Sequence, residues 1–258
     1  MNRKIRVAAQ IQPQHGEYRA LRAAAVRAED LGVDIIYNWD HFYPLYGPPD
    51  GAHLECWTVL GAWAEVTDRV EIGSLVTCYS YRNAHLLADM ARTVDNISEG
   101  RLILGLGSGW FERDYTEYEY PFGTAGSRLR DFEAGMHRIK YRLRRLNPPP
   151  TREIPILIGG MGEKHTLRIA GRYADIWHGF GDAEVARRKN RILDDWCRAA
   201  GRDPAEVERS MDVTGADADS GDELYEAGVS QITLGISGPD WDMAGVPDWV
   251  AWRDEKNS

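Results

Sequence analysis

The hexapeptide YNWDHF at residues 37–42 places an aspartate beside a histidine at the end of an apolar run. Imidazole titrates near neutral pH, so His41 could give or take a proton during a catalytic cycle. The neighbouring Asp40 could hold that ring in one tautomer, although adjacent residues of a strand point to opposite faces and need not touch. The alternative is a purely structural loop, in which both side chains form hydrogen bonds with the local backbone. Both residues are candidate catalytic groups whose role depends on the rest of the chain.

Two further stretches place polar or small residues directly after an apolar run. Residues 71–83 read EIGSLVTCYSYRN, which could face a flat ligand that forms hydrogen bonds or could be a turn into a helix capped by Asn83. Residues 104–115 read LGLGSGWFERDY, and the alternating glycines would let a ligand approach the backbone closely or would form a tight packing turn. The second stretch lacks the glycine spacing of a dinucleotide-binding fingerprint.

The glycine-rich stretch ILIGGMGEKHT at residues 156–166 gives the most specific physical signal. Gly159, Gly160 and Gly162 lead directly into a helical pattern that begins at Glu163. Unpaired amides at the start of a helix, reached through glycines, form a binding site for phosphate or another anion. A plain connection between a strand and a helix could also be rich in glycine, so the sequence leaves both interpretations open.

Each of these stretches follows one of eight short apolar runs that alternate with amphipathic segments. The expected strands are 5–10, 34–39, 70–76, 102–106, 154–158, 176–180, 211–214 and 231–234. The expected helices are 18–31, 54–66, 84–97, 129–146, 164–172, 185–200, 221–227 and 246–255. Eight such units predict a (β/α)8 barrel of the TIM type, with an open doubly wound sheet as the alternative. In a barrel the candidate residues would all lie at the carboxyl ends of the strands, where active sites form.

The composition limits the class of protein. The 258 residues form a single expected domain, 1–258, and the net charge of −9 disfavours a general nucleic-acid or membrane-surface binder. Three widely spaced cysteines indicate neither a disulfide framework nor a metal site, and the seven histidines lack paired ligand spacing, so we expect no metal. No signal peptide or membrane span is visible, which predicts a cytoplasmic protein.

Taken together, the motifs resemble those of the luciferase-like flavin and deazaflavin oxidoreductases. The resemblance covers residues 6–203 and rests on four stretches in order: DHFYPLYGPPDGAHLECW, IGSLVTCYSYRN, SEGRLILGLGSGWFERDY and IPILIGGMGEKHTLRIAGRYADIWH. It is strongest toward the branch that uses the 8-hydroxy-5-deazaflavin coenzyme, F420. The resemblance implies a (β/α)8 barrel that binds one flavin-like cofactor at the carboxyl ends of its strands.

The resemblance also implies roles for particular residues. His41 would lie near the redox carbon as proton donor or acceptor, and Asp40 would touch the cofactor ring or its neighbours. Family members often have a non-proline cis peptide after the third strand, which here would join Leu75 to Val76. The cofactor-contacting residues implied are Asp40, Leu75, Val76, Thr77, Ser108, Gly109, Gly159, Gly160, Met161 and Gly162, the last four around its phosphate.

Some features depart from the family pattern. The deazaflavin sugar-phosphate dehydrogenases have an acidic glutamate where this chain has Trp110, so neither that acid nor that substrate is transferred. The segment between the fourth helix and the fifth strand and the C-terminal units are shortened, and part of the cleft could come from a second subunit of a homodimer. We expect an F420-dependent oxidoreductase that transfers hydride to or from a small organic substrate. The alternatives are an FMN-dependent monooxygenase and a non-catalytic barrel that binds a cofactor or a protein.

Overall fold

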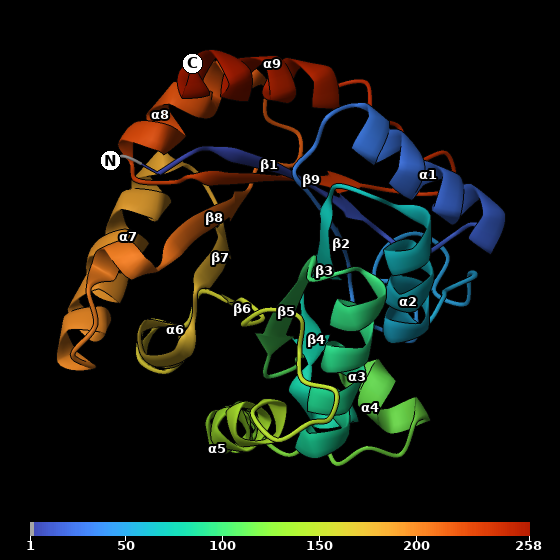
Figure 1. Cartoon of the computed structure of the whole chain (residues 1–258), viewed down its shortest axis with the longest axis vertical. Coiled ribbons are helices and arrows are strands. Elements are labelled where there is room, and N and C mark those ends of the chain that lie inside the picture. Colours follow the sequence, from blue (N-terminus) through green and yellow to red (C-terminus); the bar gives the residue numbers. More distant parts are fainter. Residues whose placement is uncertain (1–2) are drawn as a thin grey trace.

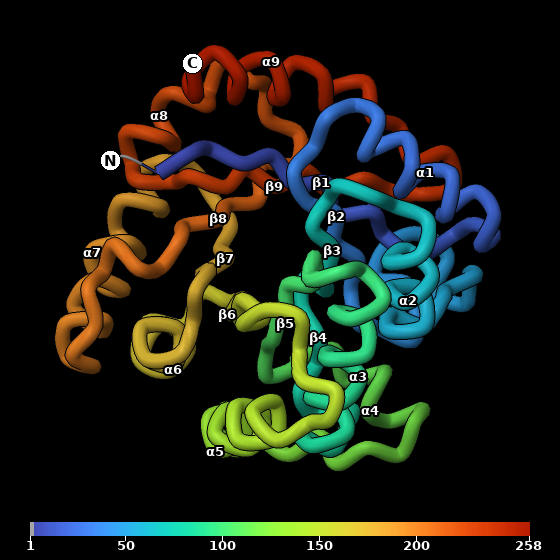
Figure 2. Tube along the Cα trace, viewed as in Figure 1, coloured from blue at the N-terminus to red at the C-terminus, as the bar shows by residue number. Residues whose placement is uncertain are grey.

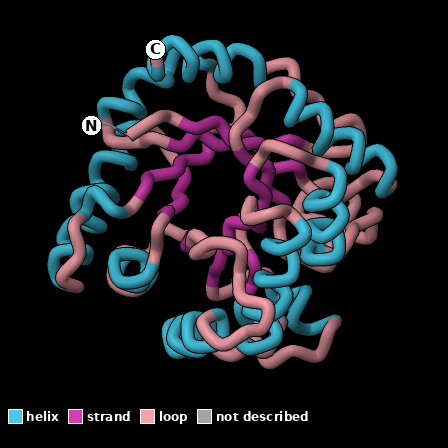
Figure 3. Tube along the Cα trace, in the orientation of Figure 1, coloured by secondary structure: helices cyan, strands magenta, loops and turns pink. Residues whose placement is uncertain are grey.

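A closed ring of parallel strands surrounded by helices forms the computed structural model, which describes residues 3–258 (Figures 1 and 3). The strands are β1 (Arg6–Ile11), β2 (Ile35–Asn38), β3 (Glu71–Ser74), β4 (Thr77–Cys78), β5 (Leu102–Gly107), β6 (Ile156–Gly159), β7 (Ile176–Phe180), β8 (Glu208–Asp212) and β9 (Gln231–Ile236). All of their pairings are parallel, and the pairing of β3 with β5 closes the ring. Because β3 and β4 are two halves of one barrel position, the predicted eight-unit barrel is confirmed and the open sheet is wrong.

The helices cover the outside of this ring (Figure 1). They are α1 (Tyr18–Asp30), α2 (Cys56–Val66), α3 (Ala84–Ile97), α4 (Glu112–Glu117), α5 (Ala125–Leu143), α6 (Thr166–Tyr173), α7 (Ala183–Ala199), α8 (Gly221–Glu226) and α9 (Val246–Asn257). The chain ends lie on the same side of the molecule (Figure 2), and Asn257 bonds to both backbone groups of Ile5 at 2.9 Å. None of the helices in residues 3–258 combines the length and apolar character that a membrane span requires.

The sequence-based prediction missed the start of one strand and one short helix. The seventh expected strand was 211–214, but the corresponding β8 begins at Glu208, because Glu208 and Arg209 are charged residues that the fold buries to 4% and 7% exposure. The short helix α4 was not predicted, because six residues are too few to show a helical period. Near the C-terminus, Trp241 and Trp249 pack within the chain, since each is 1% exposed.

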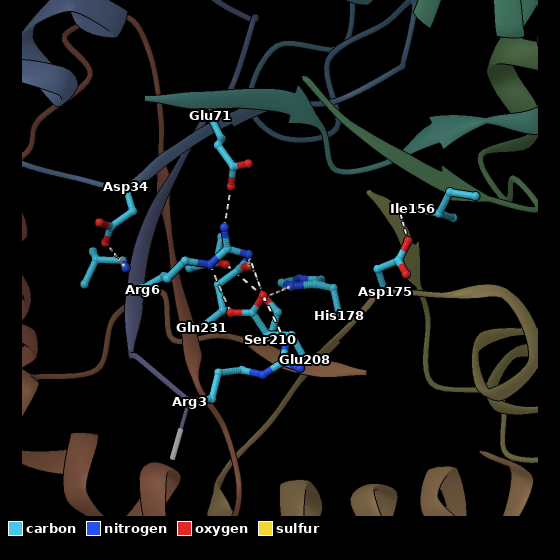
Figure 4. A network of polar contacts seen from close by, with 12 residues as sticks. Arg3, Arg6, Asp34, Glu71, Ile156, Asp175, His178, Glu208, Ser210 and Gln231 are labelled. Atoms are coloured by element: carbon cyan, nitrogen blue, oxygen red, sulfur yellow. Dashed lines mark hydrogen bonds and ion pairs between the residues drawn. The ribbon is translucent and has the colours of Figure 1, made fainter. Parts of the chain in front are cut away.

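Charged and polar side chains fill one end of the barrel interior (Figure 4). Arg6 points inward from β1 and forms ion pairs with Glu71 of β3 and Glu208 of β8. Burial alone would lower the pKa of Arg6, but the two glutamates, Glu208 above all, raise it overall. Gln231 of β9 donates to Tyr37 Oη at 3.2 Å and to Ser210 Oγ at 2.9 Å. This network occupies the interior at the amino ends of the strands, so any ligand space inside the barrel must lie at the other end.

Glycines allow close packing toward the carboxyl ends of the strands. A Cβ on Gly105 would lie 1.8 Å from the carbonyl oxygen of Ser74, and one on Gly235 would lie 2.6 Å from Thr214 Oγ1. Gly107 and Gly159 lie at the same end of the barrel, where β5 and β6 finish. Larger residues at these positions would collide with their neighbours, so the barrel requires glycine there.

Candidate functional site

His41 lies just beyond β2 and is held by a carboxylate that is distant in sequence. Asp114 Oδ2, on α4, is 2.7 Å from His41 Nδ1, and Asp114 Oδ1 accepts from the amide of Phe42 at 3.1 Å. Tyr81 donates to the same carboxylate at 3.0 Å. Asp114 is fully buried, while 12% of the His41 side chain is exposed. An Nδ1 proton shared with Asp114 leaves Nε2 of His41 as the atom that can exchange a proton with a ligand.

Aromatic rings surround this imidazole on its other sides. The rings of Trp39, Trp110 and Phe111 lie 6.0, 5.9 and 5.5 Å from that of His41, all in edge-to-face arrangements. Trp110 is 63% exposed at the rim. An exposed tryptophan beside a half-enclosed imidazole provides an apolar surface for a flat ligand.

Asp40 is turned away from this imidazole. Its two carboxylate oxygens accept from Arg82 at 2.5 and 2.9 Å, and one of them also accepts from the amide of Cys78 at 3.0 Å. Arg82 reaches on to Glu55, which caps the start of α2, at 2.6 Å. Burial raises the pKa of Asp40 above its ordinary value, and Arg82 opposes that rise. The idea that Asp40 fixes the tautomer of His41 is therefore wrong, because Asp114 makes that contact and Asp40 joins β2 to the loop after β4.

The peptide between Leu75 and Val76 is cis, at the position that the family resemblance implied. The carbonyl of Leu75 accepts from Gln10 Nε2 at 2.7 Å, and Ser74 Oγ lies 2.5 Å from Thr77 Oγ1. Val76 projects into the barrel mouth, where a Cβ on Gly107 would lie 2.6 Å and one on Gly159 would lie 2.8 Å from its methyl groups. The side chain of Val76 thus forms a floor between β5 and β6.

Gly159→Ala should destabilise the fold by about 1–3 kcal/mol, because the new methyl group would collide with Val76, whose branched side chain is held close to the backbone. Gly61→Ala is the matched control, since a Cβ at this position of α2 meets nothing within 4 Å and alanine favours helix. Urea unfolding of both variants measures the difference. Equal stability of the two variants would contradict the close packing between β6 and Val76.

Ser108 and Gly109 follow β5 on the side of the mouth nearer to His41. Gly109 has φ +79°, and a Cβ there would lie 2.0 Å from Tyr115 Oη and 2.5 Å from Cys78 Sγ. Ser108 accepts from Tyr115 through its carbonyl at 3.4 Å, and its hydroxyl bonds to no other residue in 3–258. Its backbone is thereby fixed while its hydroxyl is available to a ligand.

The 159–162 loop, which continues from β6, is held in place by hydrogen bonds with β7 and α7. The amide of Gly160, with φ +129°, donates to the carbonyl of His178 at 3.0 Å, and Lys189 donates to the carbonyl of Met161 at 3.0 Å. No hydrogen bond within residues 3–258 uses the amides of Met161 or Gly162. Helix α6 begins at Thr166 rather than at Glu163, so these amides precede a turn and not the first helical residue. The amide of Gly160 is already bonded, which leaves the next two amides for an anion.

Two further histidines were not among the predicted site residues. His53 lies beside Trp39 at the candidate site, whereas His178 belongs to the polar network of the barrel interior (Figure 4). His53 Nε2 accepts from Trp39 Nε1 at 3.0 Å, and burial, with the nearby His41, lowers the pKa of His53 to about 4. His178 of β7 lies 2.9 Å from Ser210 Oγ, and burial lowers its pKa to about 4 as well. Both of these rings are therefore neutral near pH 7. Of the three histidines, His41 is the one whose ring contacts a carboxylate. No group of three or more potential metal-ligating side chains occurs in residues 3–258.

These contacts form a continuous track across the mouth. The imidazole of His41 meets Trp110, the same β5 loop runs back to Gly107, Gly107 contacts Val76, and Val76 contacts Gly159 at the start of the 159–162 loop. A proton-exchanging group, a flat apolar floor and unpaired amides therefore follow one another. Such a track suits an elongated ligand with a planar reactive end and an anionic tail.

Comparisons with curated relatives show a distant but extensive likeness. An uncharacterized protein of Mycobacterium tuberculosis is 26% identical over 244 residues, which is 83% of this chain and 86% of that protein. An F420-dependent glucose-6-phosphate dehydrogenase of Amycolatopsis mediterranei is 40% identical over 94 residues, which is 35% of this chain and 27% of that enzyme. The chain thus matches the mycobacterial protein over most of both lengths.

Solved structures with the same fold include two different kinds of enzyme. An F420-dependent secondary alcohol dehydrogenase, in complex with an F420-acetone adduct, superposes with a TM-score of 0.84 at 17% identity over 96% of this chain and 98% of that one. A monooxygenase from Streptomyces bottropensis superposes with a TM-score of 0.72 at 16% identity over 96% and 98%. The family model described as luciferase-like monooxygenase matches residues 3–236. The chain belongs to the luciferase-like monooxygenase family.

Proposed function

We propose that this protein is an F420-dependent oxidoreductase that transfers hydride between the coenzyme and a small organic substrate, with His41 moving the accompanying proton. The observation that carries this proposal is the buried contact between His41 and Asp114, which orients one imidazole nitrogen at the edge of the mouth. F420-dependent proteins among its relatives and structural neighbours support the choice of coenzyme.

The chain's own residues fit such a coenzyme. We place its planar ring over Val76, whose methyl groups fill the space beside Gly107 and Gly159, with Leu75 and Thr77 on either side of this floor. Its side chain would run past Ser108 and Gly109, and its phosphate would accept from the amides of Met161 and Gly162. Asp40 would act at a distance, by fixing the loop after β4 through Arg82.

The coenzyme would supply the hydride chemistry when bound, and the protein would supply the proton. With Nδ1 bonded to Asp114, His41 would give a proton from Nε2 when a carbonyl is reduced and take one when an alcohol is oxidised. Trp110 and Phe111 would keep water from the imidazole and hold an apolar substrate against it.

Titration of the purified apoprotein with F420 and with FMN tests the choice of cofactor. We expect a lower dissociation constant for F420, followed by absorbance or fluorescence, and no oxygen consumption by the reduced complex. Tighter binding of FMN together with oxygen consumption would replace the proposal by a flavin monooxygenase. Tight binding without turnover on a broad panel of carbonyls and alcohols would favour a non-catalytic barrel.

Asp114→Asn should lower kcat about 10- to 100-fold without changing the dissociation constant of the coenzyme. The amide is isosteric, but it can present an N–H toward His41 and so select the other imidazole tautomer. The pH profile of kcat distinguishes this loss of positioning from a general structural defect, because only the former moves the profile. If neither kcat nor its pH profile changes, Asp114 has no role in proton transfer.

A further inference from the structure

A basic pocket of about 780 Å³ lies at the end of the barrel opposite to the mouth. It is bounded by α7, by the segment that precedes β8 and by the turn that precedes β9. Its wall consists of Arg3, Arg187, Asn190, Arg191, Asp194, Pro204, Ala205, Val207, Arg209, Ala227, Gly228 and Ser230. None of these residues belongs to the site described above, so the pocket requires its own explanation.

Positive charge in this pocket exceeds negative charge, although the chain as a whole carries a net charge of −9. Arg209 is neutralised by Asp194 at 2.5 Å, the one acidic residue of the wall. Arg187 and Arg191 are exposed, lie one turn apart on α7 and form no ion pair with any residue in 3–258. The third guanidinium, that of Arg3, lies 3.9 Å from Glu208 and donates to the carbonyls of Ala205 and Glu206 at 2.7 and 3.2 Å. Two guanidinium groups beside one cavity, without an ion pair in residues 3–258, predict an anionic ligand.

One buried polar atom in the wall lacks a partner. Asn190 is 9% exposed and donates to the carbonyl of Ala227 at 2.8 Å, but its Oδ1 has no hydrogen-bond partner within residues 3–258. Buried polar atoms are normally paired, so this unused acceptor beside a cavity indicates a ligand with its own polar groups. The hydroxyl of Ser230 forms no hydrogen bond within the same range and is available to such a ligand.

The remaining wall is apolar, contributed by Pro204, Ala205, Val207 and Ala227. A free inorganic anion would leave this part of the cavity unfilled. An organic phosphate with an apolar or aromatic group would pair its phosphate with Arg187 and Arg191 and bury its carbon skeleton against Val207. We propose that this pocket is a second ligand site, distinct from the barrel mouth, that binds a small organic phosphate ester.

Calorimetric titration of the full-length apoprotein with phenyl phosphate tests this proposal. We expect saturable binding with one molecule per chain, at least a tenfold loss of affinity in the double variant Arg187→Gln/Arg191→Gln, and no binding of phenol. Arg19→Gln/Arg22→Gln is the matched control. These two arginines are also exposed and also lie about one turn apart, but on α1, and they are not part of the pocket wall. Its affinity should equal that of the unmodified chain.

Several outcomes would overturn the proposal. Absence of saturable binding of phenyl phosphate would overturn it. Full affinity in the Arg187→Gln/Arg191→Gln variant would also overturn it, because the phosphate would then bind at another site, such as the 159–162 loop. A loss of equal size in the Arg19→Gln/Arg22→Gln control would show general charge attraction. Ser230→Ala provides an independent measurement, and it should lower the affinity for phenyl phosphate several-fold. Because these titrations involve neither coenzyme nor turnover, their failure leaves the proposed redox function untouched.

Discussion

Replacing His41 by asparagine should reduce turnover by about 10²- to 10⁴-fold while the coenzyme binds as before. Asparagine can still donate to Asp114 from a position close to that of Nδ1, so the local contact survives, but the amide cannot exchange a proton at neutral pH. The loss should appear in kcat and not in the dissociation constant of the coenzyme, because the proposed ring and phosphate contacts involve other residues. Steady-state kinetics and a fluorescence titration of the same preparation measure the two quantities.

His85→Asn is a suitable control for this variant. His85 is a partly exposed histidine on α3, 3.4 Å from Arg142, and lies outside the barrel mouth. It should retain full activity. His41→Ala removes the ring and its aromatic contacts as well, and it should lose at least as much activity as the asparagine variant. Turnover of the asparagine variant within about threefold of the unmodified chain would remove His41 from the mechanism and leave Asp114 without a catalytic role.

The fold was accessible from the sequence because its main signal is repetitive. Each apolar run in the barrel wall is short, branched and bounded by turn residues, and the eight runs recur with helical patterns between them. The signal failed where a strand carries buried charges: Glu208 and Arg209 belong to β8, but charged residues do not predict a buried strand. Their burial depends on Arg6 and Asp194, which come from distant segments.

The candidate site was only partly accessible for a related reason. His41 was selected because it directly follows a strand, and the family resemblance correctly located the cis peptide before Val76. Asp114 was missed, although it is the residue that holds the imidazole, because it comes from a six-residue helix far along the chain. Asp40 was selected beside His41 from their adjacency and from the family resemblance, but its carboxylate accepts from Arg82 and does not bond to His41. Contacts between distant segments set the chemistry, and one sequence does not show them.

The buried pair between Asp40 and Arg82 should dominate the stability of this region. The two side chains are 0% and 9% exposed, and Arg82→Met would leave the carboxylate with only the amide of Cys78 as a partner. Removing one member of a buried pair costs about 3–5 kcal/mol, because the remaining charge stays desolvated. Arg113→Met is the matched control: Arg113 forms an ion pair with Asp50, whose side chain is 81% exposed, so this variant should lose little stability.

The pH dependence of Arg82→Met provides the sharper test. Burial already raises the pKa of Asp40, and Arg82 opposes the rise, so the pKa in the variant should be higher still. A carboxyl with a raised pKa binds its proton more tightly in the folded state, so its folding penalty grows as pH rises through the folded pKa and is relieved as pH falls. Urea unfolding should therefore show a smaller deficit at pH 5 than at pH 8. Asp40→Asn/Arg82→Met should recover much of the loss at pH 8, since no charge remains to be buried. A deficit that is the same at both pH values, or a double variant no more stable than the single one, would show that the loss comes from packing around Arg82 and not from the stranded carboxylate.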